Sequence, residues 1–247
     1  KNILFVNEPG TTESSTPGAV VELARANDAR LTLCEVLQPL PRNFVRLEKA
    51  IHGMRLAQLQ GMLAGEDLEG LEVEYRVLQG TSFIEIIREV DRGQHDLVIK
   101  NAEPGSISFG ANDMHLLRKC PVPLWIAKSD NFGRYRNIVA AVDVDPEAPA
   151  NRELNRLIMD LAVSLARESG CRLHVVHAWS VPNEGLLRGV ELAFGHEQLD
   201  ELVETTGRNH EDWLEELLKG WDLSDIDHQL HVGKGRPSQY IQSITEM

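Results

Sequence analysis

The sequence contains one pattern twice, and this duplication limits the folds open to the chain more than any other feature. The apolar run at 3–6 is echoed by a run at 138–142. In both halves a polar loop, a helical stretch and a second apolar run follow, at the same spacing. Self-similarity at this scale indicates two copies of one domain.

Short apolar runs alternate with helical stretches in each copy. Each run is too short for a helix and suits a buried strand. In the second copy we expect a helix that is capped by Gly170 and packs through one apolar face: Leu154, Leu157, Ile158, Leu161, Ala162 and Leu165. In the first copy, Ser82 and Glu85 match a capping box for a helix that Gly93 closes. Longer amphipathic helices are expected to include Phe44, Leu47, Ile51 and Met54 in the first copy and Leu199, Leu202, Val203, Trp213 and Leu217 in the second.

This alternation predicts an α/β fold with two tandem, doubly wound parallel sheets, each covered by helices on both faces. We expect a first domain at 1–130 and a second at 135–247, joined near 129–134. The first half adds a strand at 96–100, a short helix at 113–118 and a closing strand at 122–126, which Pro121 and Pro123 mark as an edge strand. The second half stops at Met247 before these elements, so we expect it to be truncated before its last strands. An exposed edge of apolar parallel strands promotes aggregation, which favours an incomplete sequence.

Composition excludes several classes of function. Lys+Arg 25 against Asp+Glu 38 gives a net charge of −13, which disfavours binding to nucleic acid or to anionic membrane surfaces. No stretch is long and apolar enough to cross a bilayer, and the apolar start is too short for a signal peptide. We therefore expect a cytoplasmic protein without membrane insertion. The cysteines, Cys34, Cys120 and Cys171, lie far apart and are interpreted as small buried hydrophobic residues.

Two histidine pairs suggest a metal site at first inspection. His174 and His177, like His228 and His231, lie three positions apart on expected strands. Such positions point to opposite faces, so neither pair can hold one ion, and we expect no metal. The turn at 233–238 lacks phosphate-loop spacing, and no hydrolase elbow or zinc-protease motif is present. No feature of the sequence requires an enzyme.

Ligands of open parallel sheets bind beyond the carboxyl ends of the strands. Asn7 and Asp143 hold this position on the first strand of each half. The Asp143 carboxylate could accept from a ribose hydroxyl or an exocyclic amine, or it could cap its own loop. The loop at 101–110 lies where a phosphate cradle would be, but Glu103 and Asp113 bring negative charge there, which disfavours phosphate binding.

Several segments carry a family resemblance. They are the strand starts at 3–7 and 138–143, the strand at 173–177, the turn and helix at 80–87, the strand at 95–100 and the segment at 113–125. Together they resemble the universal stress proteins of the tandem-domain type. The resemblance spans nearly the whole chain and implies an adenine nucleotide alpha-hydrolase-like fold and a role in stress survival without an established reaction.

The resemblance also implies where a nucleotide would bind. ATP-binding members carry an Asp at the end of the first strand and a Gly-x-x-Gly-x9-Gly-Ser/Thr signature after the fourth. The first half departs from this pattern at several positions, so we expect a degenerate pocket there that does not bind ATP in the family manner. Its candidate residues are Val6, Asn7, Val36, Asn101, Gly110 and Ala111, with Asn7 replacing the Asp and Asn101 the opening glycine.

In the second half Val142, Asp143 and Ala178 match the family's nucleotide-binding positions, and the phosphate signature would lie beyond Met247. The leading hypothesis is a non-enzymatic stress-response protein that binds ATP or another adenine nucleotide in its second domain only. A carrier or sensor of an apolar, lipid-like molecule in the degenerate pocket is the alternative, and an adenylating enzyme is a third hypothesis that lacks a reactive group. We expect the domains to face each other as a pseudo-dimer, with a homodimer as a further option.

Overall fold

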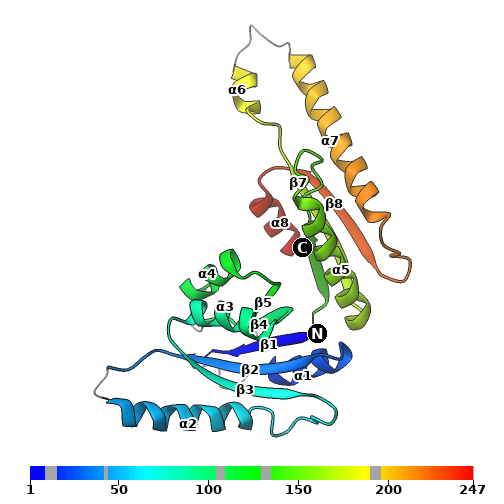
Figure 1. Cartoon of the computed structure of the whole chain (residues 1–247). Helices are drawn as coiled ribbons and strands as arrows, with labels where there is room; N and C mark the ends of the chain where they lie inside the picture. The colour runs from blue at the N-terminus through cyan, green and yellow to red at the C-terminus, as the bar shows by residue number, and fades with distance from the viewer. Residues whose placement is uncertain (9–15, 42–43, 104–108, 129–134, 190–195, 247) are drawn as a thin grey trace. The chain divides into compact units, whose positions relative to one another are not determined.

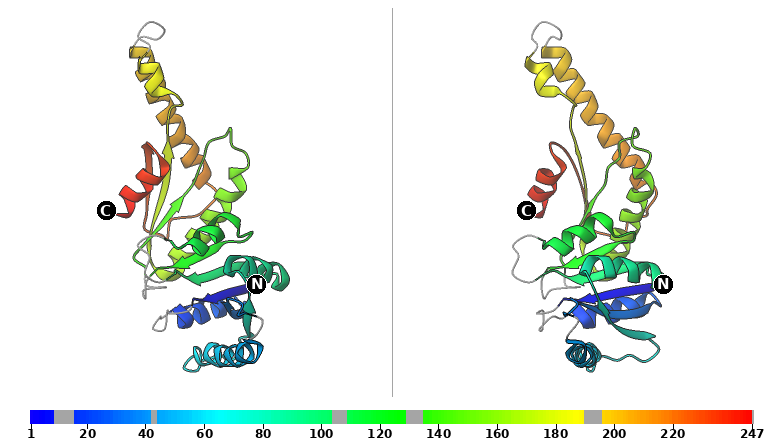
Figure 2. Two further views of the ribbon diagram at one scale, coloured as in Figure 1. Left: turned by 90° about the vertical axis from the view of Figure 1, so that its left-hand side faces the viewer. Right: turned by 60° about the vertical axis from the view of Figure 1, so that its left-hand side comes forward.

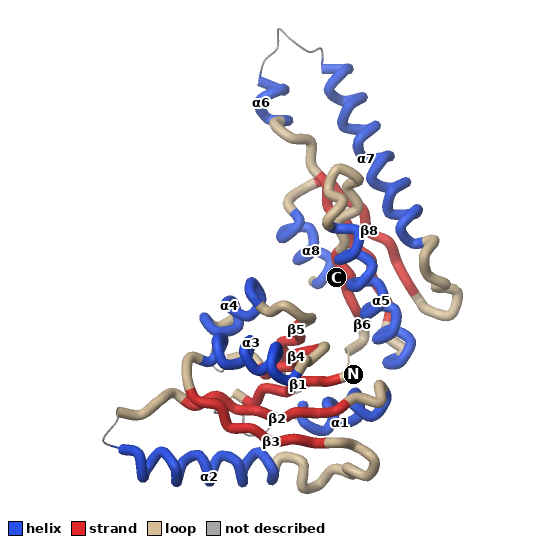
Figure 3. The backbone as a smooth tube through the Cα atoms, in the orientation of Figure 1, coloured by secondary structure: helices blue, strands red, loops and turns tan. Residues whose placement is uncertain are grey.

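The structure is a computed structural model that describes residues 1–8, 16–41, 44–103, 109–128, 135–189 and 196–246. The chain divides into two compact units, Lys1–Gly133 and Arg134–Met247. Each unit has its own parallel sheet (Figures 1 and 3). The expected α/β class, with two tandem parallel sheets and a smaller second one, is confirmed. The expected linker at 129–134 lies outside the described residues.

The first unit contains a five-stranded sheet in the order β3-β2-β1-β4-β5. Its strands are β1 (Asn2–Asn7), β2 (Arg30–Leu37), β3 (Val73–Gln79), β4 (Leu97–Asn101) and β5 (Leu124–Ala127). All neighbours pair in parallel. The central strand β1 is covered on both faces, so it is apolar at successive positions rather than alternating. The strand order reverses beside β1, which places a ligand crevice above the carboxyl ends of β1 and its neighbours.

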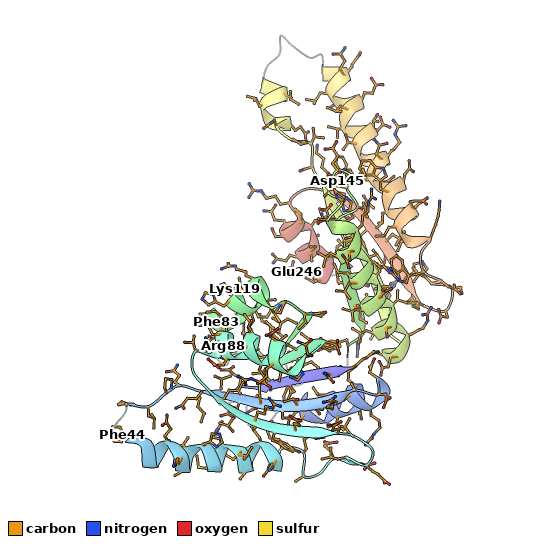
Figure 4. All side chains as sticks on the ribbon, viewed as in Figure 1. Phe44, Phe83, Arg88, Lys119, Asp145 and Glu246 are labelled. Carbon is orange, nitrogen blue, oxygen red and sulfur yellow. The ribbon has the colours of Figure 1, made fainter. Side chains whose placement is uncertain are left out.

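Helices cover both faces of this sheet (Figures 1 and 2). On one face lie α1 (Thr16–Ala26) and α2 (Val45–Gly61), where Val20 joins a core formed with β1 and β2. On the other lie α3 (Ser82–Gly93) and α4 (Ala111–Lys119), which bury Ile86 and Leu116. Phe83 of α3 and Lys119 of α4, labelled in Figure 4, lie close together, with the ammonium 5.1 Å from the ring centroid.

The second unit contains a three-stranded parallel sheet in the order β6-β7-β8. The strands are β6 (Asn137–Ala141), β7 (Arg172–Trp179) and β8 (His228–Lys234). The long helices α5 (Asn151–Ser169) and α7 (His196–Leu218) cover one face and share its core. On the other face is α8 (Pro237–Thr245), whose Tyr240 ring lies against Gly233, and α6 (Glu184–Gly189) precedes α7.

The expected packing face of α5 is confirmed only in part, since Ala162 and Ile158 pack on the core and the leucines at its centre do not. The helix buries Asn155, Met159, Ala162, Val163 and Ala166, whereas Leu154, Leu157 and Leu161 are 54%, 42% and 41% exposed. The small alanine side chains let the helix approach the sheet closely, and the leucines occupy the neighbouring face of the helix. Periodicity alone does not show which of two adjacent apolar faces packs. The same holds for α2, where Phe44, Leu47 and Met54 are exposed (Phe44 is labelled in Figure 4).

One of the expected helix ends differs, and two are confirmed. The capping box of Ser82 and Glu85 is not formed, because the helix begins one residue earlier than expected, with Thr81 as its N-cap, and Glu85 pairs with Arg88 instead. At the other end, α3 finishes at Gly93 as expected, and Gln94, which follows it, adopts the left-handed conformation at φ 47°. The expected cap of α5 is confirmed, since Gly170 has φ 62°.

Candidate functional site

A crevice of about 550 Å³ lies above the carboxyl ends of β1, β2 and β3 in the first unit. It is lined by Val6, Asn7, Glu8, Val36, Leu37, Gln38, Pro39, Gly80, Thr81, Ser82 and Asn112. This volume suits a small-molecule ligand. The lining combines the ends of apolar strands with amide, hydroxyl and carboxylate groups.

The side chain of Asn7 is held on the α2 side of the sheet. Its amide donates to Oε2 of Glu35, at 2.9 Å, and Asn7 is the register partner of Glu35. The Glu35 side chain is 1% exposed, and both Nε and Nη2 of Arg55 lie 2.6 Å from its Oε1. Asn7 thus donates to a buried ion pair, whereas an Asp at this position would put a second carboxylate against Glu35.

A fully buried lysine lies at the end of β4. Nζ of Lys100 is 2.7 Å from Oε2 of Glu8 and 2.8 Å from Oδ1 of Asp113, and it donates to the carbonyl of Asn101 at 2.9 Å. An ammonium group has three protons, so these contacts use all of its donors. One cation is therefore shared by two carboxylates. Burial is the main cause that raises the pKa of Glu8, and the hydrogen bond from Lys100 opposes it.

Carboxylates of the chain also fill the N-terminus of α4. Oδ2 of Asp113 accepts from the backbone N–H groups of Glu103, at 3.0 Å, and Gly110, at 3.3 Å. The Glu103 carboxylate accepts from the backbone and side-chain amides of Asn112, at 3.2 Å and 2.7 Å. A Cβ atom at Gly110 would collide with the Glu103 side chain, so the absence of a side chain at Gly110 leaves room for the Glu103 carboxylate.

These contacts occupy the groups that an incoming phosphate would use. A helix N-terminus attracts anions through its free N–H groups and its dipole. Here Asp113 and Glu103 already supply the anions, and Lys100 is saturated by protein oxygens. A triphosphate at this place would meet carboxylates rather than donors.

The predicted first-half residues fall into two groups. Val6, Asn7 and Val36 line the crevice. Asn101 is buried at the end of β4, while Gly110 is the N-cap of α4 and Ala111 its first residue. The second group belongs to the charge cluster, whose main members, Lys100 and Glu8, the sequence analysis did not single out. A lysine within the apolar run of β4 was the available signal, because buried lysines are rare unless paired. The middle of the predicted loop, 104–108, lies outside the described residues.

In the second unit, Asp143 follows β6 and is anchored through its backbone. Its N–H donates to Oδ1 of the buried Asn155, at 3.0 Å, and its carbonyl accepts from Nδ2 of Asn155, at 2.6 Å. Its exposed carboxylate accepts from Asn151, at 2.8 Å, and from the N–H of Asp145, at 3.4 Å. Asp143 therefore caps its loop, and its carboxylate keeps lone pairs that face solvent.

The other predicted second-half residues lie on neighbouring strand ends. Val142 is buried, and its carbonyl is 3.0 Å from Nδ1 of His177. Ala178 is half-buried near the end of β7 and pairs with Gly233 of β8. The sheet thus places Val142 and Ala178 at the same edge as Asp143, as their strand positions require.

A groove of about 790 Å³ that the sequence analysis missed runs between α5 and α7. Its lining includes Asp143, Arg152, Trp213 and Trp221. Nε1 of Trp221 donates to Oδ1 of Asp160 across the groove, at 2.8 Å. Asp145, labelled in Figure 4, also lines it. The sequence signal was the pair of tryptophans in an otherwise aromatic-poor chain.

The described residues contain no cluster of three or more His, Cys, Asp or Glu side chains that could hold a metal ion. The histidines three apart do not meet each other. Instead His174 contacts His231, and His177 contacts His210.

Cys34 and Cys171 are buried as expected, whereas Cys120 is half-buried. Across the described ranges, no helix combines the length and apolar character needed to cross a membrane.

Comparisons with known proteins agree with this architecture. Residues 10–128 match the family model described as Universal stress protein family. The chain is 27% identical over 183 residues to Universal stress protein E of Escherichia coli (strain K12), covering 72% of this chain and 56% of that protein. It is 26% identical over 197 residues to Universal stress protein E of Photorhabdus laumondii, covering 73% of this chain and 63% of that protein. The matches thus span little more than half the length of these curated relatives.

Solved structures share the fold. A functionally unknown protein, PA1789, from Pseudomonas aeruginosa PAO1 superposes with a TM-score of 0.66 at 22% identity, covering 99% of this chain and 77% of that one. A universal stress protein from Archaeoglobus fulgidus superposes with a TM-score of 0.59 at 14% identity, covering 99% and 82%. The resemblance noted in the sequence is confirmed by the family and curated matches.

Proposed function

The first unit of this chain is a universal stress protein domain, and on this premise we propose that the protein is a cytoplasmic stress-response factor that acts by binding rather than catalysis. Its first unit does not hold ATP in the family manner. Any adenine nucleotide binds in the second unit, where Val142, Asp143 and Ala178 lie at strand ends. A homodimer of two chains is a further part of this proposal.

One observation carries the nucleotide part of the proposal: the charge cluster of Lys100, Glu8, Asp113 and Glu103 in the first unit. Its carboxylates accept from the N–H groups of Gly110 and Asn112 at the start of α4, and together with the Asn101 carbonyl they engage all three protons of Lys100. A bound triphosphate would have to displace these contacts and also face the carboxylates' charge. In the second unit, by contrast, the Asp143 carboxylate is exposed and can accept hydrogen bonds from a ligand.

Equilibrium dialysis of the full chain against labelled ATP and Mg²⁺ tests this assignment. We expect at most one site per chain, weakened by Asp143→Ala. Asp212→Ala removes an exposed carboxylate from α7 of the same unit and should leave binding unchanged. Two sites of equal affinity, or one site that Asp143→Ala does not weaken, would contradict the assignment.

A second candidate is a carrier or sensor of an apolar, lipid-like small molecule in the first-unit crevice. The crevice of about 550 Å³ favours it, because its strand ends Val6, Val36 and Leu37 offer apolar contacts. Native mass spectrometry of protein purified from cells separates the candidates. A bound mass other than a nucleotide favours the carrier, and an ATP mass alone excludes it.

A further inference from the structure

Four histidines of the second unit form two hydrogen-bonded pairs on opposite faces of its sheet. On the α7 face, Nε2 of His177 in β7 lies 2.9 Å from Nδ1 of His210 in α7. On the α8 face, Nδ1 of His174 in β7 lies 2.9 Å from Nε2 of His231 in β8. The rings stack, with centroids 4.9 Å and 5.1 Å apart.

The neighbours of the first pair determine its tautomers. Nδ1 of His177 lies 3.0 Å from the Val142 carbonyl, which can only accept, so this nitrogen carries the proton. In neutral His177 the other nitrogen, Nε2, is then an acceptor, and Nδ1 of His210 must donate to it. The chain of donors runs from His210 through His177 to the carbonyl that precedes Asp143.

The second pair is determined in the same way. Nε2 of His174 lies 3.3 Å from Oδ1 of Asn137, so this nitrogen donates and Nδ1 accepts. Nε2 of His231 is therefore the donor between the two rings. This chain crosses all three strands, from β8 through β7 to β6.

Both pairs depend on neutral imidazoles. One added proton can bind at the outward nitrogen, Nε2 of His210 or Nδ1 of His231, but it places a charge at a largely buried ring. A second proton removes the accepting nitrogen and leaves two N–H groups facing each other across 2.9 Å. We propose that these imidazole pairs are an acid-sensitive latch, which ties α7 and the three strands together at neutral pH and releases them on mild acidification.

The charged groups around His210 have opposite effects on its protonation. Asp143 and Asp145, in the loop after β6, favour protonation of His210, while His177 and burial disfavour it. Trp179 and Trp213, which stack on or meet the His210 ring, carry no charge. On α7 the neighbouring carboxylates of Glu211 and Asp212 are exposed to solvent.

Around the second pair, the Arg172 guanidinium of β7 disfavours a proton on His231. Asn137 of β6 is neutral, and α8 has no charged side chain in its range Pro237–Thr245. Burial, the largest cause, lowers the pKa of both His210 and His231. The unfolded chain therefore binds protons more readily, and the stability of the second unit is lost as the pH falls below about 6.5.

Nitrogen-15 NMR of the imidazoles in the full chain tests the geometry directly. At neutral pH we expect His177 and His210 to carry their proton on Nδ1, and His174 and His231 on Nε2. Freely exchanging tautomers at these four residues, or the opposite tautomers, would overturn the proposal from data on the native chain alone.

Amide hydrogen exchange of the same full chain tests the release. After correction for intrinsic rates, we expect β7 and α7 to exchange faster at about pH 5.5 than at neutral pH, by up to about tenfold for each imidazole that the fold keeps neutral, because pH 5.5 lies about one unit below the ordinary histidine pKa of about 6.5. Protection of β7 and α7 that does not change with pH would overturn the proposal.

Paired variants separate the latch from general acid sensitivity. His210→Asn keeps a donor at the place of Nδ1, and His231→Gln keeps one at the place of Nε2, but neither can be protonated. The double variant should show a smaller pH dependence in β7 and α7, because of the four histidines only His174 and His177 remain to be protonated, whereas His52→Asn, at an exposed site on α2, should retain the full dependence. An unchanged pH dependence in the double variant would contradict the proposal, and if that variant does not fold, the exchange and tautomer data on the native chain decide.

Discussion

Replacing Lys100 by Met removes the cation at the centre of the first unit's charge cluster. The ammonium is fully buried and contacts Glu8 and Asp113, whose side chains are 17% and 0% exposed. Methionine fills a similar volume without a charge. The variant leaves two carboxylates close together, of which Asp113 still accepts from the backbone N–H groups of Glu103 and Gly110.

The size of the effect follows from this burial. Removing one partner of a buried ion pair costs about 3–5 kcal/mol, mainly because the remaining charge stays buried without compensation. Glu8 is partly solvated and can take up a proton, which places the expected loss near the lower end, at about 3 kcal/mol. Since a whole domain is stable by about 5–15 kcal/mol, the variant should fold with a clearly weakened first unit.

Urea-dependent amide exchange of β1 and β4 in the full chain measures this loss for the first unit alone. Arg88→Met is the control, because it removes an ion pair on the surface of α3 and should cost about 0.5 kcal/mol or less. The double variant Lys100→Met/Asp113→Leu should be less destabilised than the sum of its single variants. A loss below about 1 kcal/mol for Lys100→Met would refute the view that Lys100 neutralises the cluster.

Three further predictions each concern a single residue. Neither ring nitrogen of the buried His95 has a hydrogen-bond partner in the part of the chain that the structure describes, and burial lowers the pKa of this histidine. The stability of the first unit should therefore fall as the pH drops below about 6.5. His95→Leu should reduce this pH dependence, which thermal melts at two pH values would measure. Asn155→Ala removes both hydrogen bonds to the Asp143 backbone and should destabilise the second unit by about 2–4 kcal/mol in urea unfolding; an unchanged midpoint would contradict the anchoring role. Gly110→Ala must displace the Glu103 carboxylate, so a shifted side-chain position should be visible in a crystal structure, together with a measurable loss of stability.

The sequence was sufficient to predict the layout of the sheets because the signal is local and repeated. The apolar runs of β1 and β6 are short and buried, and the edge position of β5 follows from Pro121 and Pro123. The packing face of α5 could not be predicted in this way. Leucines and small alanines form adjacent stripes on that helix, and only the tertiary structure determines which stripe meets the sheet.

The same limit applies to the candidate sites. Sequence position identified Asn7 and Asp143 as strand ends, and the structure describes both at the carboxyl edge of their sheets. The partners that define their roles come from distant segments. Glu35 and Arg55 hold Asn7, and Asn155 holds Asp143. No local spacing links these residues, because the contacts arise only when helices pack on the strands.

The most direct test of the central claim is a titration of the full chain with ATP and Mg²⁺, followed by amide chemical shifts. If the first unit's own carboxylates occupy the position where a phosphate would bind, the amide signals that shift will be those around Val142, Asp143 and Ala178. The signals of Asn101, Gly110 and Ala111 will not shift. Saturable shifts centred on Asn101 and Gly110, with an affinity equal to that of the second unit, would contradict the claim.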